Sequence, residues 1–144
     1  SIGGIGGAQK TTSIEEYAKQ YIGVDSQGKV DDAVLRNQIL SHRMNDSAFG
    51  LTMKRSVQES ATGTAPGAVS SMFKYYGTEQ NKGKYELLLS ILGTQSLGWS
   101  GDNFAADELT TTRAWLRSKA NSIEGGTSEV QLNILAKRVL ALPE

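Results

Sequence analysis

The chain has 144 residues, of which 38% are hydrophobic and 21% charged, and this composition predicts one globular domain with a core of its own. Its 15 basic and 15 acidic side chains cancel, and no apolar run is long enough to cross a bilayer, so neither nucleic acid binding nor membrane insertion is expected. Because the chain has no cysteine, a disulfide scaffold and a thiolate site are excluded, and a cytoplasmic location is expected.

Two helices are predicted in the first part of the chain. The first has apolar residues at the spacing of one helix face, and Ser13 and Glu16 before and within it have the spacing of a capping box. After a predicted loop at residues 23–28, Asp31 is the expected N-cap of a long second helix that runs to about Ala61.

Three more helices are predicted after the break at residues 62–67. The third begins near Val69, carries a dense apolar surface at residues 87–92 and stops at Gly93. Residues 93–104 are expected to form a loop, followed by a fourth helix from Ala106 to about Ala120 and a fifth from Ser128 to Ala141. No segment alternates with period two, so the predicted fold class is all-α: an antiparallel, up-and-down four-helix-type bundle with an additional C-terminal helix.

The segment SIEGGTSEVQ, residues 122–131, has the clearest local signal. A glycine pair permits left-handed backbone and close approach, Thr127 or Ser128 can cap the helix that follows, and Ser128 and Gln131 have capping-box spacing. The free amides of such a helix start attract an anion such as a pyrophosphate, but a well-capped helix without a ligand explains the pattern equally well. His42 is the only histidine, which argues against a metal site or a Ser–His–Asp triad.

Residues 122–143, SIEGGTSEVQLNILAKRVLALP, closely resemble the C-terminal signature of the acyl-CoA dehydrogenases. Three looser resemblances, YAKQYIG at 17–23, LRNQI at 35–39 and LLLSILGTQSLGW at 87–99, follow in the family's order. The family has an N-terminal helical domain, a middle β domain and a C-terminal helical bundle. Residues 1–144 look like the last of these three, as a fragment of a longer chain.

The resemblance also implies an activity. Members of the family remove the α proton and the β hydride of an acyl-CoA substrate and form the trans-2-enoyl-CoA. The cofactor FAD accepts the hydride and passes electrons to an electron-transferring flavoprotein, and the helical bundle supports a homotetramer and contributes to FAD sites across subunits. A non-catalytic subunit or assembly scaffold, and a related flavin-dependent acyl-CoA oxidase, are the alternatives.

Individual site residues follow from the same resemblance. Gly126, Thr127 and Glu129 match family positions near the flavin or its phosphates, and Lys19 stands where many members have an arginine. Gly125 occupies the place of the glutamate that serves many members as base, and glycine cannot abstract a proton. The base is therefore expected upstream of Ser1, with the adjacent Glu124 as the second choice.

Overall fold

The computed structural model describes residues 13–64, 67 and 69–143. This part of the chain contains five α-helices and no strand: α1 (Ile14–Tyr21), α2 (Ala33–Ala61), α3 (Val69–Leu92), α4 (Ala106–Asn121) and α5 (Ser128–Ile134). A 3-10 helix, η1 (Gly93–Leu97), follows α3, and a π-helical turn, η2 (Leu135–Val139), continues α5. None of these helices has the length and apolar character needed to cross a membrane.

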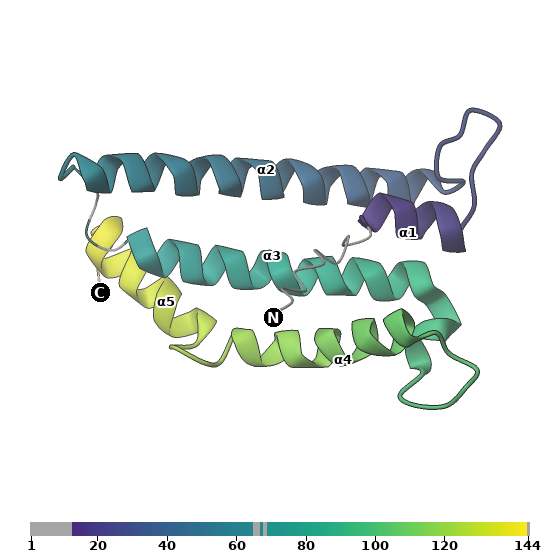
Figure 1. Cartoon of the computed structure of the whole chain (residues 1–144). Helices are drawn as coiled ribbons and strands as arrows, with labels where there is room; N and C mark the ends of the chain where they lie inside the picture. Colours follow the sequence, from purple (N-terminus) through teal and green to yellow (C-terminus); the bar gives the residue numbers. More distant parts are fainter. Residues whose placement is uncertain (1–12, 65–66, 68, 144) are drawn as a thin grey trace, which may run out of the picture.

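Helix α3 lies at the centre of the bundle. It packs against α1, α2, α4 and α5, and the long helices α2, α3 and α4 lie side by side with alternating directions (Figure 1). Helix α1 lies beside one end of this layer, and α5 crosses its other end obliquely (Figure 1). The predicted all-α bundle with an additional C-terminal helix is therefore confirmed.

The buried core is concentrated at the end of the bundle where α1, the start of α2 and the second half of α3 meet. Its members are Tyr17, Ala18, Val30, Leu35, Ile39, Leu87, Leu88, Ile91 and Leu92. Farther along, α2 and α3 are joined by aromatic contacts of Phe49, whose ring centroid lies 5.8 Å from that of Phe73 and 5.3 Å from that of Tyr76. Burial of these apolar side chains therefore holds α1 against the second half of α3.

Two of the predicted helix starts can be checked atom by atom. The capping box before α1 is confirmed, because Ser13 Oγ accepts from the Glu16 backbone N–H and Glu16 Oε2 accepts from the Ser13 N–H. The expected N-cap of α2 was wrong by one residue, since Asp32 takes this role and accepts from the Leu35 N–H at 2.9 Å. Asp31 instead donates its N–H to the Gly23 carbonyl at 3.1 Å and so belongs to the preceding turn.

Two of the later predicted segments need correction. Helix α5 ends at Ile134 and gives way to a π turn in which Leu140 N–H donates to the Leu135 carbonyl, so the predicted regular helix to Ala141 was wrong. The left-handed φ of Ala141, 50°, lies outside any helix. The loop expected at 93–104 begins with the 3-10 helix η1.

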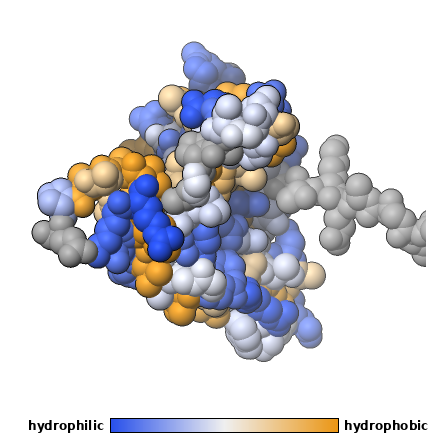
Figure 2. All heavy atoms as spheres, turned by 90° about the vertical axis from the view of Figure 1, so that its left-hand side faces the viewer, coloured by the Kyte–Doolittle hydropathy of each residue, from blue (hydrophilic) through white to orange (hydrophobic). Residues whose placement is uncertain are grey.

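Several apolar side chains remain exposed near the C-terminal end of the chain. Figure 2, which looks onto the end of the molecule where α5 terminates, shows hydrophobic residues in patches between hydrophilic ones. The exposed large apolar residues of α5 and the segment after it are Val130, Leu132, Val139, Leu140 and Leu142. A surface of this kind suits contact with further protein.

Candidate functional site

The glycine pair before α5 adopts the left-handed backbone that glycine permits. Gly125 and Gly126 have φ angles of +66° and +96°, which side-chain-bearing residues rarely adopt. A Cβ atom on Gly126 would lie 2.6 Å from Gln131 Nε2, so a side chain here would force the end of Gln131 to move. The pair turns the chain sharply between the end of α4 and the start of α5.

Thr127, and not Ser128, caps α5. The Thr127 Oγ1 accepts from the Val130 N–H at 3.3 Å, whereas Ser128 is already helical and its hydroxyl donates to Glu79 Oε1 at 3.2 Å. The predicted capping box of Ser128 and Gln131 was wrong, because the buried Gln131 side chain donates back to the Gly125 carbonyl at 3.1 Å. That carbonyl is within reach since the left-handed glycines fold it towards the helix.

Glu129 places a carboxylate at the same helix start. Its pKa is lowered by hydrogen bonds from its own backbone N–H and from the Thr127 hydroxyl. The Glu129 side chain is exposed and ionised at neutral pH, so this end of α5 offers a negative charge and a hydroxyl beside its amides. Such a set suits a ligand with hydroxyl or N–H donors better than a ligand with a free phosphate.

Lys74 of α3 lies beneath this loop. Its Nζ donates to the carbonyl of Asn121, the last residue of α4, at 2.9 Å and to the Gly126 carbonyl at 2.7 Å. Lys82, also on α3, forms an ion pair with Glu79 at 3.1 Å. No local motif in the sequence marks Lys74, because its acceptors lie about fifty residues further along the chain.

Glu124 is engaged by two neighbours. Its carboxylate accepts from Arg117 Nη2 at 3.0 Å and from Asn121 Nδ2 at 2.7 Å, and these hydrogen bonds hold its pKa below the usual value. A carboxylate with a lowered pKa is a poorer proton acceptor. The geometry thus gives little support to the second-choice base.

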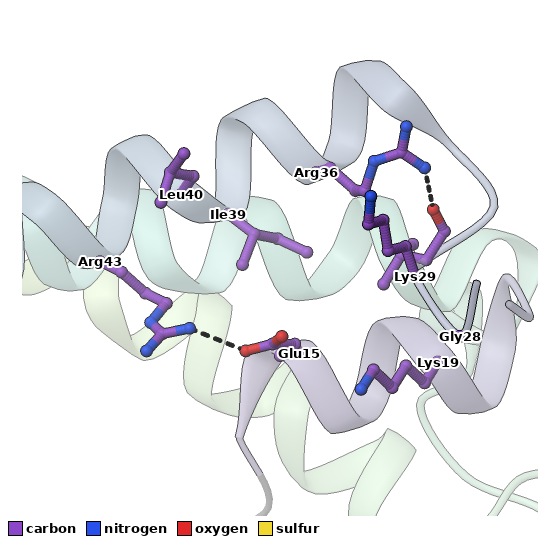
Figure 3. A pocket seen from close by; sticks show the side chains of 9 residues that line it. Glu15, Lys19, Gly28, Lys29, Arg36, Ile39, Leu40 and Arg43 are labelled. Atoms are coloured by element: carbon purple, nitrogen blue, oxygen red, sulfur yellow. Dashed lines mark hydrogen bonds and ion pairs between the residues drawn. The ribbon is translucent and has the colours of Figure 1, made fainter. Parts of the chain in front are cut away.

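Lys19 lies in a different place, in a basic pocket between α1, α2 and the turn that joins them (Figure 3). Four cationic side chains and one carboxylate line the pocket: Lys19, Lys29, Arg36, Arg43 and Glu15. Arg43 pairs with Glu15 at 2.8 Å, and Arg36 donates to the Val30 carbonyl. Within the part of the chain that the structure describes, Lys19 forms no ion pair.

Sequence reasoning found only Lys19 among these cations. Arg36 and Arg43 are seven residues apart, which is two helical turns. The sequence alone could therefore have placed both on one face of α2. Lys29 could not, because the closure of the turn by the Val24–Val30 bridge decides where its side chain goes. Arg36 also pairs with Asp25 at 3.7 Å, so the positive charge that suits a diphosphate or another polyanion is carried mainly by Lys19 and Lys29.

The position of α1, and so of Lys19, is fixed by two tyrosines. Tyr17 Oη donates to Asp107 at 2.8 Å and Tyr21 Oη to Glu108 at 2.7 Å, both at the start of α4. Burial, together with the hydrogen bond to Asp107, raises the pKa of Tyr17 to about 12. The pKa of Tyr21 is raised in the same way, by burial and by the carboxylate of Glu108.

The predicted cofactor residues do not come together within one chain. Lys19 lies on α1, which packs against the second half of α3, while Gly126 is held by Lys74 in the first half (Figure 1). Residues 74 and 88 are separated by about 20 Å along the helix at 1.5 Å per residue. One chain thus carries two separate polar sites, the basic pocket and the loop before α5.

Comparison with known proteins identifies the family to which the chain belongs. The family model described as "Acyl-CoA dehydrogenase, C-terminal domain" matches residues 3–140. The acyl-CoA dehydrogenase IpdE1 of Mycolicibacterium smegmatis is 27% identical over 136 residues, which cover 94% of this chain and 31% of that protein. The chain thus spans about a third of the length of this curated relative, and no solved structure gave a significant match. The chain belongs to the acyl-CoA dehydrogenase family and corresponds to its C-terminal domain.

Proposed function

We propose that this chain is the C-terminal helical domain of a flavin-dependent acyl-CoA dehydrogenase that converts an acyl-CoA to its trans-2-enoyl-CoA. The observation that carries the proposal is the match to the family's C-terminal domain along nearly the whole chain. The glycine pair and capped helix at residues 125–134 support it, because they lie in the segment with the strongest resemblance. In this role the domain contributes to FAD binding and to assembly.

The two polar sites suit different parts of FAD. The basic pocket around Lys19 has the charge for the diphosphate, and Arg36 supplies a guanidinium where lysine replaces the family's arginine. Gly126, Thr127 and Glu129 offer backbone, hydroxyl and carboxylate groups, which suit the uncharged hydroxyl and N–H groups of the cofactor. The chain's residues therefore fit the cofactor, with each site taking the part that matches its charge.

The separation of the two sites supports a cofactor shared between subunits. The parts of α3 that lie beside the two sites are about 20 Å apart, so the two sites are not neighbouring contacts to one group of the cofactor. In a homo-oligomer, for which we propose a tetramer, the basic pocket of one subunit and the loop before α5 of another can meet at the same FAD. Exposed apolar side chains on α2 and α5 provide surface for such assembly.

Proton abstraction is proposed to come from a residue outside this chain. Gly125 has no side chain, and the Glu124 carboxylate is held by Arg117 and Asn121 with a lowered pKa. The chemistry that bound FAD supplies is acceptance of the hydride from the β carbon. An acidic residue upstream of Ser1 is therefore the proposed base, electron-transferring flavoprotein the proposed electron acceptor, and the cytoplasm the proposed location.

The test is made on the full-length protein. We expect it to purify with flavin absorbance, to lose that absorbance when acyl-CoA is added without oxygen, and to form the trans-2-enoyl-CoA. The 144 residues alone are expected to show neither property, because they match only the C-terminal domain of the family. Full-length protein that holds no flavin and turns over no member of an acyl-CoA panel would contradict the proposal.

An assembly scaffold is the second candidate, and one observation favours it. Neither Gly125 nor the ion-paired Glu124 offers a free base in this chain. A scaffold would co-purify with a catalytic relative, and its own flavin would not bleach with any acyl-CoA. Loss of turnover after replacement of one acidic residue upstream of Ser1 would instead rule the scaffold out.

A further inference from the structure

We infer that Lys74 is a positioning residue, which fixes the loop before α5 so that Thr127 and Glu129 face the cofactor; this inference rests on the proposed function. Its ammonium group joins three elements, because it extends from α3 and donates to the carbonyls of Asn121 at the end of α4 and of Gly126 before α5. Two of its three N–H donors are thereby used on backbone atoms.

The two acceptors explain why a cation stands here. The last carbonyls of a helix lack partners within the helix and carry the negative end of its dipole, and Asn121 ends α4. Among the described residues, no carboxylate lies within ion-pair distance of Lys74, so its charge is directed at carbonyl oxygens. Charge-assisted hydrogen bonds of this kind are stronger than neutral ones.

The loop needs such a restraint because two glycines give it freedom. Gly125 and Gly126 both have positive φ, and glycine populates several backbone regions about equally. Other hydrogen bonds also hold the loop, from Gln131 Nε2 to the Gly125 carbonyl, from the Ser128 N–H to the Ser122 carbonyl and from the Ser128 hydroxyl to Glu79. None of these three bonds is made by the peptide that joins Gly126 to Thr127.

Lys74 fixes that peptide. A trans peptide is planar, so its carbonyl and its N–H point in opposite directions. When the Gly126 carbonyl is drawn towards Lys74 on α3, the Thr127 N–H is turned to the side away from α3. The direction in which Thr127 leaves the peptide, and with it the start of α5 that carries Glu129, is then determined.

The test uses full-length protein in which Lys74→Met removes the ammonium group and keeps the length of the apolar stem. We expect the dissociation constant for FAD, measured by quenching of flavin fluorescence, to rise about tenfold. We also expect the visible circular dichroism of the bound flavin to change. Lys84→Met is the matched control on the same helix, since Lys84 Nζ lies over the Tyr85 ring and does not contact the loop.

Lys74→Gln covers the case in which Lys74→Met does not fold. Its amide still donates but is uncharged and shorter, so we expect FAD binding weaker than in the natural protein. If the natural protein binds FAD, and the folded variants bind it as tightly with an unchanged flavin spectrum, the inference is wrong and the proposed function stands. If the natural protein binds no flavin, the proposed function fails and the inference fails with it.

Discussion

At Gly126, both the left-handed backbone and the close approach of the Gln131 side chain favour glycine. The sequence indicated that the glycine pair permits left-handed backbone and a close approach. It did not predict that Gln131 would occupy the space beside Gly126, since it assigned Gln131 to a capping box. The local glycine pattern indicated the backbone conformation. It did not indicate the hydrogen bond of the Gln131 side chain, because the folded loop brings the Gly125 carbonyl to it.

A substitution at Gly126 should therefore destabilise the chain for two reasons. Gly126→Ala forces an alanine to a φ of +96° and places its Cβ against Gln131 Nε2, so we expect a loss of about 1–3 kcal/mol in the free energy of unfolding. Gly83→Ala is the control, because Gly83 lies inside α3 with open space around it and should gain about 0.5–1 kcal/mol. Urea unfolding measures the free energy of unfolding of both variants. Equal changes would contradict the proposed strain at Gly126.

The two tyrosines of α1 predict a loss of stability at alkaline pH. Their folded pKa values are raised above the unfolded value of 10, so the folded state holds the phenol protons more tightly. The stabilisation is complete below pH 10 and is lost as pH rises through about 12, the pKa of Tyr17. We expect Tyr17→Phe to lower stability at neutral pH by about 1.5 kcal/mol and to flatten the alkaline decline in Tm. An unchanged decline would contradict this assignment.

Glu124 gives the sharpest residue-scale test of the missing base. Because its pKa is lowered by Arg117 and Asn121, Glu124→Gln in full-length protein should change kcat less than about threefold, whereas loss of a general base lowers it about 10²–10⁴-fold. The acid limb of the pH–rate profile should also keep its midpoint. Arg117→Gln is the companion variant, because it removes the cation that holds the Glu124 carboxylate. A large loss of kcat with Glu124→Gln alone would make Glu124 the base.

At the scale of the element, periodicity predicted the existence and order of the helices, and failures occurred at their ends. Asp31 was expected to cap α2, but the Gly23 carbonyl binds its N–H, and Asp32 takes the role. The pattern after Ser128 continues smoothly to Leu140, and yet the backbone changes to a π turn at Leu135. Competing hydrogen bonds decide these ends, and such bonds depend on contacts that a single helix pattern does not contain.

Helix α2 carries an apolar stripe that the fold leaves uncovered. Leu40, Met44 and Leu51 lie on one face at four- and seven-residue spacing, opposite the core residues Leu35 and Ile39, and are 55%, 63% and 67% exposed. The sequence predicts a long α2 that carries apolar residues, but it does not show which of them face α3. We propose that this stripe contacts another subunit of the homo-oligomer.

A charge on the stripe should weaken assembly without unfolding the domain. We expect Met44→Glu in full-length protein to lower the association constant about a hundredfold, because a lone carboxylate in an apolar interface is poorly solvated. Val34→Glu is the control, since Val34 is 68% exposed on another face of α2. Light scattering across a dilution series measures both. The same oligomer for Met44→Glu and the natural protein would exclude the stripe from the interface.

At the scale of the whole molecule, the arrangement of the two sites was beyond the sequence. The resemblance assigned Lys19 and Thr127 to the same cofactor, and nothing in their spacing indicated that α3 would hold them apart. The packing of α1 against Leu87, Leu88 and the rest of the core sets this separation. Fold class follows from local patterns, whereas the distance between two sites follows from tertiary packing, which those patterns do not determine.

If one FAD is shared by two subunits, damaged sites should complement one another in mixed oligomers. Lys19→Glu and Thr127→Ala are each expected to weaken flavin binding in full-length protein, the first by reversing a charge in the basic pocket and the second by removing the α5 cap. In a mixed pair, one shared site combines both defects. The other receives Lys19 from the Thr127→Ala subunit and Thr127 from the Lys19→Glu subunit, and is therefore intact.

Co-expression of the two variants with different affinity tags allows the mixed oligomer to be isolated, and its ratio of bound flavin to protein can be compared with that of each variant alone. We expect the mixed oligomer to recover flavin that neither parent retains. If Lys19 and Thr127 served the same cofactor from within one chain, every site would carry one defect and no flavin would be recovered. The unmixed variants, purified and combined without exchange of subunits, provide the control, because recovery must depend on a site formed between two chains.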